Sequence, residues 1–172
     1  MADCTARWIA PITAVSLAAW PGEAPALAAR LRARFALDLA APGRWTQADG
    51  LVCVWLAPDH WQIERVGRHD LLPALVAAAA EHGAAIDVSD ARAVLRLSGP
   101  GSRDLLARLL PLDLHPRAFA PHHAASTVAA HIGVQVRQID ARPTYDLACL
   151  RSYAESLGRA VDHRGGLALG WE

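Results

Sequence analysis

The sequence predicts an α+β fold in which one split βαβ unit occurs twice. Two observations support this prediction. The order strand–helix–strand–strand–helix can be followed twice along the 172 residues. The dipeptide Pro21-Gly22, at the first strand-to-helix turn, returns as Pro100-Gly101 at an offset of 79 residues. The same offset aligns Ala14-Val15 with Ala93-Val94, and the chain therefore reads as a duplication.

The first copy is predicted from hydrophobic periodicity and turn signals. A strand at Ile12–Trp20 leads into a helix at Glu23–Phe35, in which Leu27, Leu31 and Phe35 recur on one face. Pro-Gly and Pro-Asp pairs then divide the chain into shorter elements. These are a strand at Leu51–Leu56, a return strand at Trp61–Glu64, and a helix that starts after Asp70 and ends before Gly83.

The second copy is predicted to start with a strand that runs from Ala85 towards Ser98. Its other elements are a helix that reaches Leu110, an irregular segment at Leu112–His123, strands at Thr127–Ile132, Val134–Gln138 and Tyr145–Leu150, and a helix from a Ser152/Glu155 capping box to Val161. We therefore predict duplicated ferredoxin-like halves at residues 1–83 and 84–163, followed by a flexible or partner-bound tail at residues 164–172.

Composition and charge exclude several classes of function. All 17 basic residues are arginine and they balance 17 acidic residues, so the basic excess of a nucleic-acid binder is missing. Because the chain has no lysine and no asparagine, it cannot carry a pyridoxal-phosphate Schiff base, a P-loop, a kinase site or a Cys-His-Asn triad. Scattered cysteines and the lack of an apolar run of membrane-spanning length predict a soluble, cytoplasmic protein with no membrane association.

A cluster of histidines invites a metal hypothesis. His115, His122, His123 and His131 lie close in sequence, but they lack the paired spacing of a zinc site and have no cysteine nearby. A surface loop is the favoured interpretation, and a role in lining a cavity is the alternative.

A glycine-rich turn and a pair of carboxylates also have structural interpretations. Gly99-Pro100-Gly101 lacks GxGxxG spacing, and Pro100 removes a backbone donor, so a tight turn is favoured over a phosphate site. Asp87 and Asp90 are expected to pair with Arg92 and Arg96 rather than to act as general bases. The sequence thus predicts no catalytic, cofactor-binding or metal-binding residue in this chain.

Three stretches, in the expected order, carry a family resemblance. They are DVSDARAVLRLSGPGSRDLLARLLPLDLHPRAFAP (Asp87–Pro121), VWLAPDHWQIE (Val54–Glu64) and YDLACLRSYAESL (Tyr145–Leu157). They resemble the gamma subunit of heterotetrameric sarcosine oxidase, most specifically at Leu112–Phe119. That family is related to the glycine cleavage T protein, a folate-binding aminomethyltransferase fold of duplicated ferredoxin-like units, so the resemblance implies the same fold.

The resemblance also implies a function. The complex oxidises sarcosine with oxygen to glycine and hydrogen peroxide, and releases the one-carbon unit as formaldehyde or as methylenetetrahydrofolate. It carries FAD, FMN and NAD on the alpha and beta subunits and zinc on the delta subunit. The gamma subunit is expected to hold no cofactor and to brace the alpha subunit as a non-catalytic structural partner.

Five residues are candidates for ordering the central loop, which is the irregular segment at Leu112–His123, or for contacting the partner subunit: Arg92, Arg96, Asp113, His115 and Arg117. An alternative function is that of a stand-alone, folate-binding aminomethyltransferase-like protein, although the chain is short for that architecture. A third interpretation is an α+β domain that binds an unrelated ligand.

Overall fold

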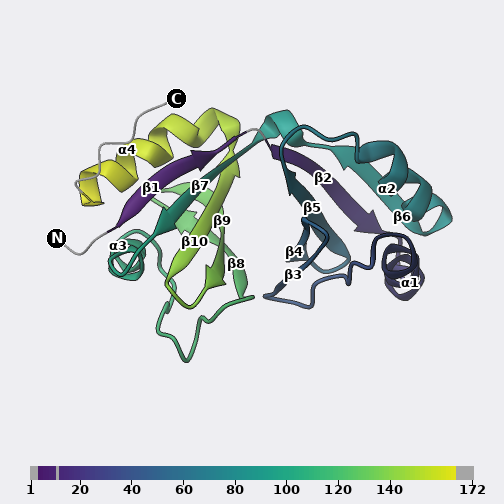
Figure 1. Cartoon of the computed structure of the whole chain (residues 1–172), viewed down its shortest axis with the longest axis horizontal. Coiled ribbons are helices and arrows are strands. Elements are labelled where there is room, and N and C mark those ends of the chain that lie inside the picture. The colour runs from purple at the N-terminus through teal and green to yellow at the C-terminus, as the bar shows by residue number, and fades with distance from the viewer. Residues whose placement is uncertain (1–3, 11, 166–172) are drawn as a thin grey trace. The chain divides into compact units, whose positions relative to one another are not determined.

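The chain folds into two compact units, one of which is assembled from two separate parts of the sequence. The computed structural model describes residues 4–10 and 12–165. One unit, here called the contiguous unit, spans Pro11–Ser89 (Figure 1). The other, here called the split unit, joins Met1–Ala10 to Asp90–Glu172. Each unit has its own hydrophobic core.

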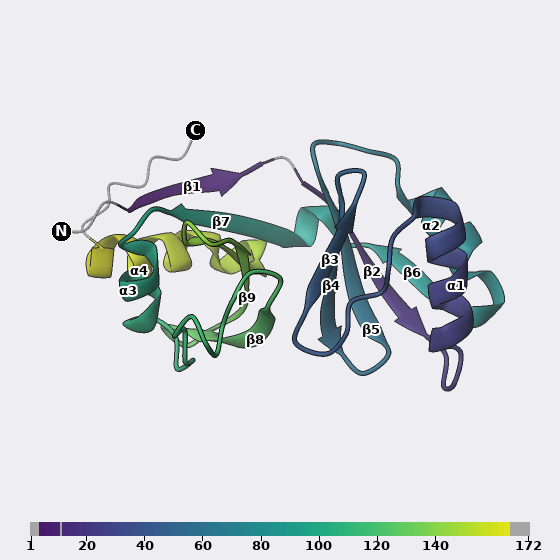
Figure 2. The ribbon, with the colours of Figure 1, turned by 60° about the horizontal axis from the view of Figure 1, so that its bottom comes forward.

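The contiguous unit is a five-stranded antiparallel sheet with two helices on one face. Its elements are β2 (Ile12–Ala19), α1 (Ala24–Phe35), β3 (Trp45–Ala48), β4 (Leu51–Ala57), β5 (His60–Val66), α2 (Leu72–Ala79) and β6 (Gly83–Asp87). The strand order is β3-β4-β5-β2-β6. Leu27 and Leu31 of α1 and Leu75 of α2 pack against Leu17 and Ile63 of the sheet, and Figure 2 shows the two helices beside each other.

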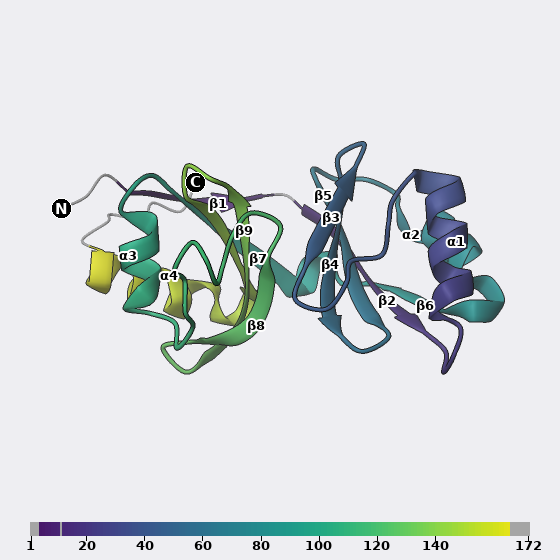
Figure 3. The ribbon, with the colours of Figure 1, turned by 90° about the horizontal axis from the view of Figure 1, so that it is seen from below.

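The split unit repeats this architecture. Its elements are β1 (Thr5–Ile9), β7 (Arg92–Ser98), α3 (Ser102–Ala107), β8 (Ala124–Ala129), β9 (Ile132–Asp140), β10 (Thr144–Leu150) and α4 (Ala154–Gly165). The strand order is β1-β7-β10-β9-β8. Figure 3 shows α3 and α4 beside each other. Leu106 of α3 and Leu157 of α4 share one core with Leu95, Leu147 and Val136, so both helices cover the same face of the sheet.

The two units correspond element by element, which confirms the predicted α+β fold of duplicated ferredoxin-like units. The hairpin of β3 and β4 corresponds to that of β8 and β9, and the strand order β2-β5-β4 in one sheet corresponds to β7-β10-β9 in the other. The edge strand that lies beside β2 or β7 comes from a different place in the chain in each unit. It is β6 beside β2 in the contiguous unit, whereas in the split unit the earlier strand β1 lies antiparallel beside β7.

Because β1 belongs to the split unit and β6 to the contiguous unit, the two units divide the chain differently from the predicted halves at residues 1–83 and 84–163. Gly83–Asp87 does not begin the second copy, because it pairs with β2 in the register Ala19↔Gly83 to Val15↔Asp87. A 3₁₀ turn at Ser89–Ala91 then separates β6 from β7. At the other end, α4 runs through Gly165, so Arg164 and Gly165 are helical, and the rest of the predicted tail lies outside the described residues.

Candidate functional site

A buried charge cluster lies on the face of the split unit's sheet that the helices do not cover. The register places Asp146 of β10 directly opposite Arg96 of β7 and Arg137 of β9. Arg96 donates from Nε to Asp146 Oδ1 at 2.7 Å and from Nη2 to Oδ2 at 2.9 Å. Arg137 donates from Nη2 to Oδ2 at 2.9 Å and from Nε at 3.2 Å. The side chain of Asp146 is only 2% exposed.

The electrostatics of this cluster keep Asp146 ionised. Burial alone raises the pKa of the Asp146 carboxyl, but the hydrogen bond from Arg96 and the positive charges of Arg137 and Arg96 outweigh it, and the pKa falls below its usual value. Both carboxylate oxygens accept hydrogen bonds from guanidinium groups. A carboxylate held in this way ties three strands together and is poorly suited to act as a general base, which needs a pKa near the working pH.

Three of the predicted residues meet in a single turn between α3 and β8. Asp113 Oδ1 accepts a hydrogen bond from the His115 backbone N–H at 2.8 Å, and His115 Nδ1 accepts one from the Arg117 N–H at 3.2 Å. The side chains of these three residues are exposed, whereas Leu114 and Phe119 are buried in the core of the split unit. The turn is therefore anchored by apolar side chains and shaped by Asp113 and His115.

The other two predicted residues lie elsewhere. Arg96 belongs to the Asp146 cluster, and Arg92, at the start of β7, faces Leu150 of β10 in the register. The sequence analysis missed Asp146 and Arg137. A detectable signal was present, because Asp146 is the single Asp, Glu, Lys or Arg residue in the mostly apolar strand that ends in Leu150, and such a residue is rarely buried without a partner.

The arginine of α3 was also missed. Arg103 donates to the Phe119 carbonyl and to Gln138 Oε1, both at 3.4 Å, and its guanidinium lies 5.6 Å from the centre of the Tyr145 ring. It joins the central loop to β9 and β10. Burial raises the pKa of Tyr145, so the phenol stays protonated.

The predicted pairing of Asp87 with an arginine is not what the structure contains. Asp87 Oδ1 accepts from the Ser89 N–H at 2.8 Å, and this hydrogen bonding to Ser89 lowers the pKa of Asp87. Ser89 Oγ in turn accepts from the Ala14 N–H at 3.0 Å. The carboxylate therefore shapes the turn that ends β6, a structural role.

A second polar cluster lies on the helix-free face of the contiguous unit. Ser16 Oγ lies 2.7 Å from His60 Nε2, and Gln62 Nε2 donates to Glu64 Oε1 at 2.5 Å. Gln62 and Glu64 are buried, at 1% and 5% exposure. A serine beside a histidine resembles part of a hydrolase triad, but alternate residues of β5 point the same way and bring Gln62, not a carboxylate, next to His60.

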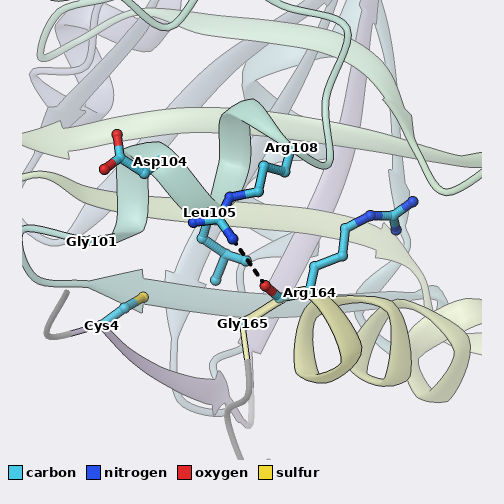
Figure 4. A pocket seen from close by; sticks show the side chains of 7 residues that line it. All are labelled: Cys4, Gly101, Asp104, Leu105, Arg108, Arg164 and Gly165. Atoms are coloured by element: carbon cyan, nitrogen blue, oxygen red, sulfur yellow. Dashed lines mark hydrogen bonds between the residues drawn. The ribbon is translucent and has the colours of Figure 1, made fainter. Parts of the chain in front are cut away.

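A small cavity lies between β1, α3 and the end of α4 in the split unit (Figure 4). It has a volume of about 140 Å³, and its walls include Cys4, Asp104, Leu105, Arg108 and Arg164. Arg108 Nη1 donates to the Arg164 carbonyl at 3.5 Å, while the guanidinium of Arg164 points away from Cys4. Burial raises the pKa of the Cys4 thiol, which makes it a poor nucleophile.

Within the described residues, no group of three histidine, cysteine or carboxylate side chains is placed to hold a metal ion. None of the helices in that part of the chain has the length and apolar composition required to cross a membrane.

Comparisons with known proteins agree on one family. Residues 18–162 match the sarcosine oxidase, gamma subunit family. The sarcosine oxidase subunit gamma of Arthrobacter sp. is 39% identical over 131 residues, which are 74% of this chain and 64% of that protein, so the match spans just under two thirds of the relative's length. A chain of the heterotetrameric sarcosine oxidase from Corynebacterium sp. U-96, solved in complex with pyrrole 2-carboxylate, superposes with a TM-score of 0.82 at 28% identity. That match covers 98% of this chain and 87% of the solved one.

The fold extends to a second group of proteins. The glycine cleavage system aminomethyltransferase T from Bartonella henselae superposes with a TM-score of 0.69 over 99% of this chain and 48% of its own. At 15% identity this similarity shows the shared fold alone.

Proposed function

This chain belongs to the sarcosine oxidase gamma subunit family, and from that premise we propose that it is a non-catalytic, structural gamma subunit of a heterotetrameric sarcosine oxidase complex. With water, the complex converts sarcosine and oxygen to glycine, hydrogen peroxide and formaldehyde. With tetrahydrofolate in place of water, the one-carbon product is methylenetetrahydrofolate. The superposition on a chain of the Corynebacterium complex, over 98% of the sequence, is the observation that carries this proposal.

The state of the ionisable side chains supports a structural role. Both carboxylate oxygens of Asp146 accept hydrogen bonds from arginines. In the turn between α3 and β8, the side chains of Asp113 and His115 accept hydrogen bonds from backbone N–H groups of the same turn. Burial raises the pKa of Cys53 to about 12 and also raises that of Cys149, so both thiols stay neutral in the cell. We place FAD, FMN and NAD on other subunits of the complex, zinc on the delta subunit, and tetrahydrofolate as a co-substrate.

The five predicted residues then divide into two groups. Arg96 orders the sheet through Asp146, and Asp113 and His115 order the central turn. Arg92 and Arg117 are the two that we assign to contacts with another subunit. The alpha subunit is the partner proposed for the main contact, the beta and delta subunits belong to the same complex, and the assembly is proposed to be cytoplasmic.

Purification of the tagged chain from its native host tests this function. We expect a yellow complex with larger and smaller subunits that produces hydrogen peroxide when sarcosine is added. A colourless chain that purifies alone would contradict the proposal.

A separate measurement addresses the folate-binding alternative. Titration calorimetry of the isolated chain with tetrahydrofolate is expected to show no micromolar binding, because the similarity to the aminomethyltransferase shows only a fold. Micromolar binding by a chain that purifies alone would favour the aminomethyltransferase-like function instead.

A further inference from the structure

The sheet of the split unit ends at a strand that has none of the usual protection of a sheet edge. β8 pairs with β9 on one side, and no strand in the described part of the chain pairs with its other side. Its six residues, Ala-Ala-Ser-Thr-Val-Ala, include no charged residue and no proline. Soluble proteins usually protect such an edge with a charge, a proline or a very short strand, because its unpaired backbone groups are a template for another strand.

The other three edges of the two sheets are protected. β1 carries Arg7 at its centre, β3 has only four residues, and β6 ends in Asp87. β8 therefore differs from every other edge strand that the structure describes.

An exposed apolar row leads to this edge on the helix-free face of the sheet. Val128 of β8 lies opposite Gly133 of β9, and Leu150 of β10 lies on the same face, because its neighbours Cys149 and Val134 pair on the core face. Val128 and Leu150 are each 47% exposed. A Cβ atom added at Gly133 would meet nothing within 4 Å, so the row has an open notch at its centre.

Basic residues flank the apolar row at its inner end. Arg92 faces Leu150 across the strand pair, and the exposed Arg151 follows Leu150 in the chain. An apolar centre with charge at its margin is the composition of a protein interface, and a basic margin favours acidic groups on the partner.

We propose that β8 and the row Leu150–Gly133–Val128 form the docking surface for an extended segment of another subunit of the complex. The segment adds a sixth strand beside β8 by backbone hydrogen bonds and then crosses the helix-free face along the row. There it places an apolar side chain over Gly133 and directs an acidic side chain to Arg92 or Arg151. This inference rests on the proposed function, because it needs a partner subunit.

A second copy of the chain fits this surface less well. If two copies paired β8 to β8 about a two-fold axis perpendicular to the sheets, the two helix-free faces would continue side by side. Val128 and Leu150 would remain exposed in both copies, and β8 offers no acidic residue to either arginine. A segment of a different chain can add a strand beside β8, cover the apolar row and supply an acidic residue to the arginines.

Two valine substitutions test the surface with a matched control. Val76, on α2 of the contiguous unit, is also 47% exposed. When the chain is co-expressed with the other subunits, we expect Val128→Lys to reduce its proportion in the purified complex by about tenfold or more, because the ammonium group would be desolvated. Val76→Lys is expected to leave the proportion unchanged. Circular dichroism melting of both variants checks that each remains folded.

Amide hydrogen exchange on the wild-type protein is a second test that needs no variant. We expect the amides of Ala124–Ala129 to exchange more slowly in the complex than in the free chain, because an added strand would protect those that point outward. Unchanged exchange in β8, or normal assembly of a folded Val128→Lys variant, would overturn the docking surface while leaving the subunit function intact. A wild-type chain that assembles with no other subunit would overturn both.

Discussion

Asp146 is an almost fully buried carboxylate, and its two partners are arginines on the strands at either side. Arg96 is 25% exposed and Arg137 only 12%, so neither guanidinium can recover full hydration if the carboxylate is lost. Breaking a buried pair by removing one partner costs more than the pair contributes, because the remaining charge is left without compensation.

For Asp146→Asn we expect a loss of about 3 kcal/mol in the free energy of unfolding, at the lower end of the range for buried pairs because Arg96 is partly hydrated. Urea denaturation measures this loss. Asp38→Asn is the control, because Asp38 pairs with Arg32 where both side chains are more than half exposed, and less than about 1 kcal/mol is expected there. Equal effects of the two substitutions would contradict a special role for the buried cluster.

The lowered pKa of Asp146 also predicts how its contribution depends on pH. The contribution is fully present above the pKa of the unfolded chain, about 3.9, and is lost as the pH falls through the lower pKa of the folded state. The difference in unfolding free energy between the wild type and Asp146→Asn is therefore expected to be constant near neutral pH and to shrink below about pH 4. A difference that does not change down to pH 2 would show that the carboxylate does not titrate in this way.

Two strand glycines give a matched pair for packing. A Cβ atom at Gly83 would lie 2.1 Å from the Ala18 carbonyl oxygen, which is backbone and cannot turn away, whereas Gly133 has open space. We expect Gly83→Ala to cost about 2 kcal/mol or more by forcing β6 from β2, and Gly133→Ala to change stability by less than about 0.5 kcal/mol. Thermal unfolding of both variants measures these changes. A Gly83→Ala variant as stable as the wild type would contradict the close approach of β6 to β2.

At the scale of elements, the turn between α3 and β8 depends on one exposed carboxylate. Asp113→Ala removes the hydrogen bond to His115, so a loss of about 1 kcal/mol is expected, together with faster amide exchange in the turn. Because Leu114 and Phe119 remain buried, the rest of the unit should keep its protection. If both Asp113→Ala and Arg117→Ala leave stability and assembly unchanged, these residues neither order the turn nor contact a partner.

Elements with local signals were predictable from the sequence. The helices at Ala24–Phe35 and Ala154–Gly165 and the strands at Leu51–Ala57 and Thr144–Leu150 all have periodic apolar residues or turn signals at their ends. β3 was missed because its four residues are too few to show a period. β1 was missed because its partner is β7, about 90 residues further along the chain, and no local pattern records that pairing.

At the scale of the whole molecule, the duplication was predictable and the division between its copies was not. A repeat of Pro-Gly turns reveals that two copies exist, but it does not say which strand closes which sheet. The residues of β1 and β6 do not indicate by themselves which of the two strands pairs with β2 and which with β7. Contacts between distant parts of the chain decide this pairing. The pairing of Asp146 with Arg96 and Arg137 escaped prediction for the same reason, since the three residues come from three strands.

The pairing of β1 with β7 has a consequence for how the chain emerges from the ribosome. Residues 5–9 are made before their partners, residues 94–98, so at about 5–20 residues per second β1 waits roughly 5–20 s for β7. All elements of the contiguous unit are made within that interval, and it can fold first. During synthesis β1 is thus an unpaired strand, and a chaperone that holds it would raise the yield of correctly closed protein.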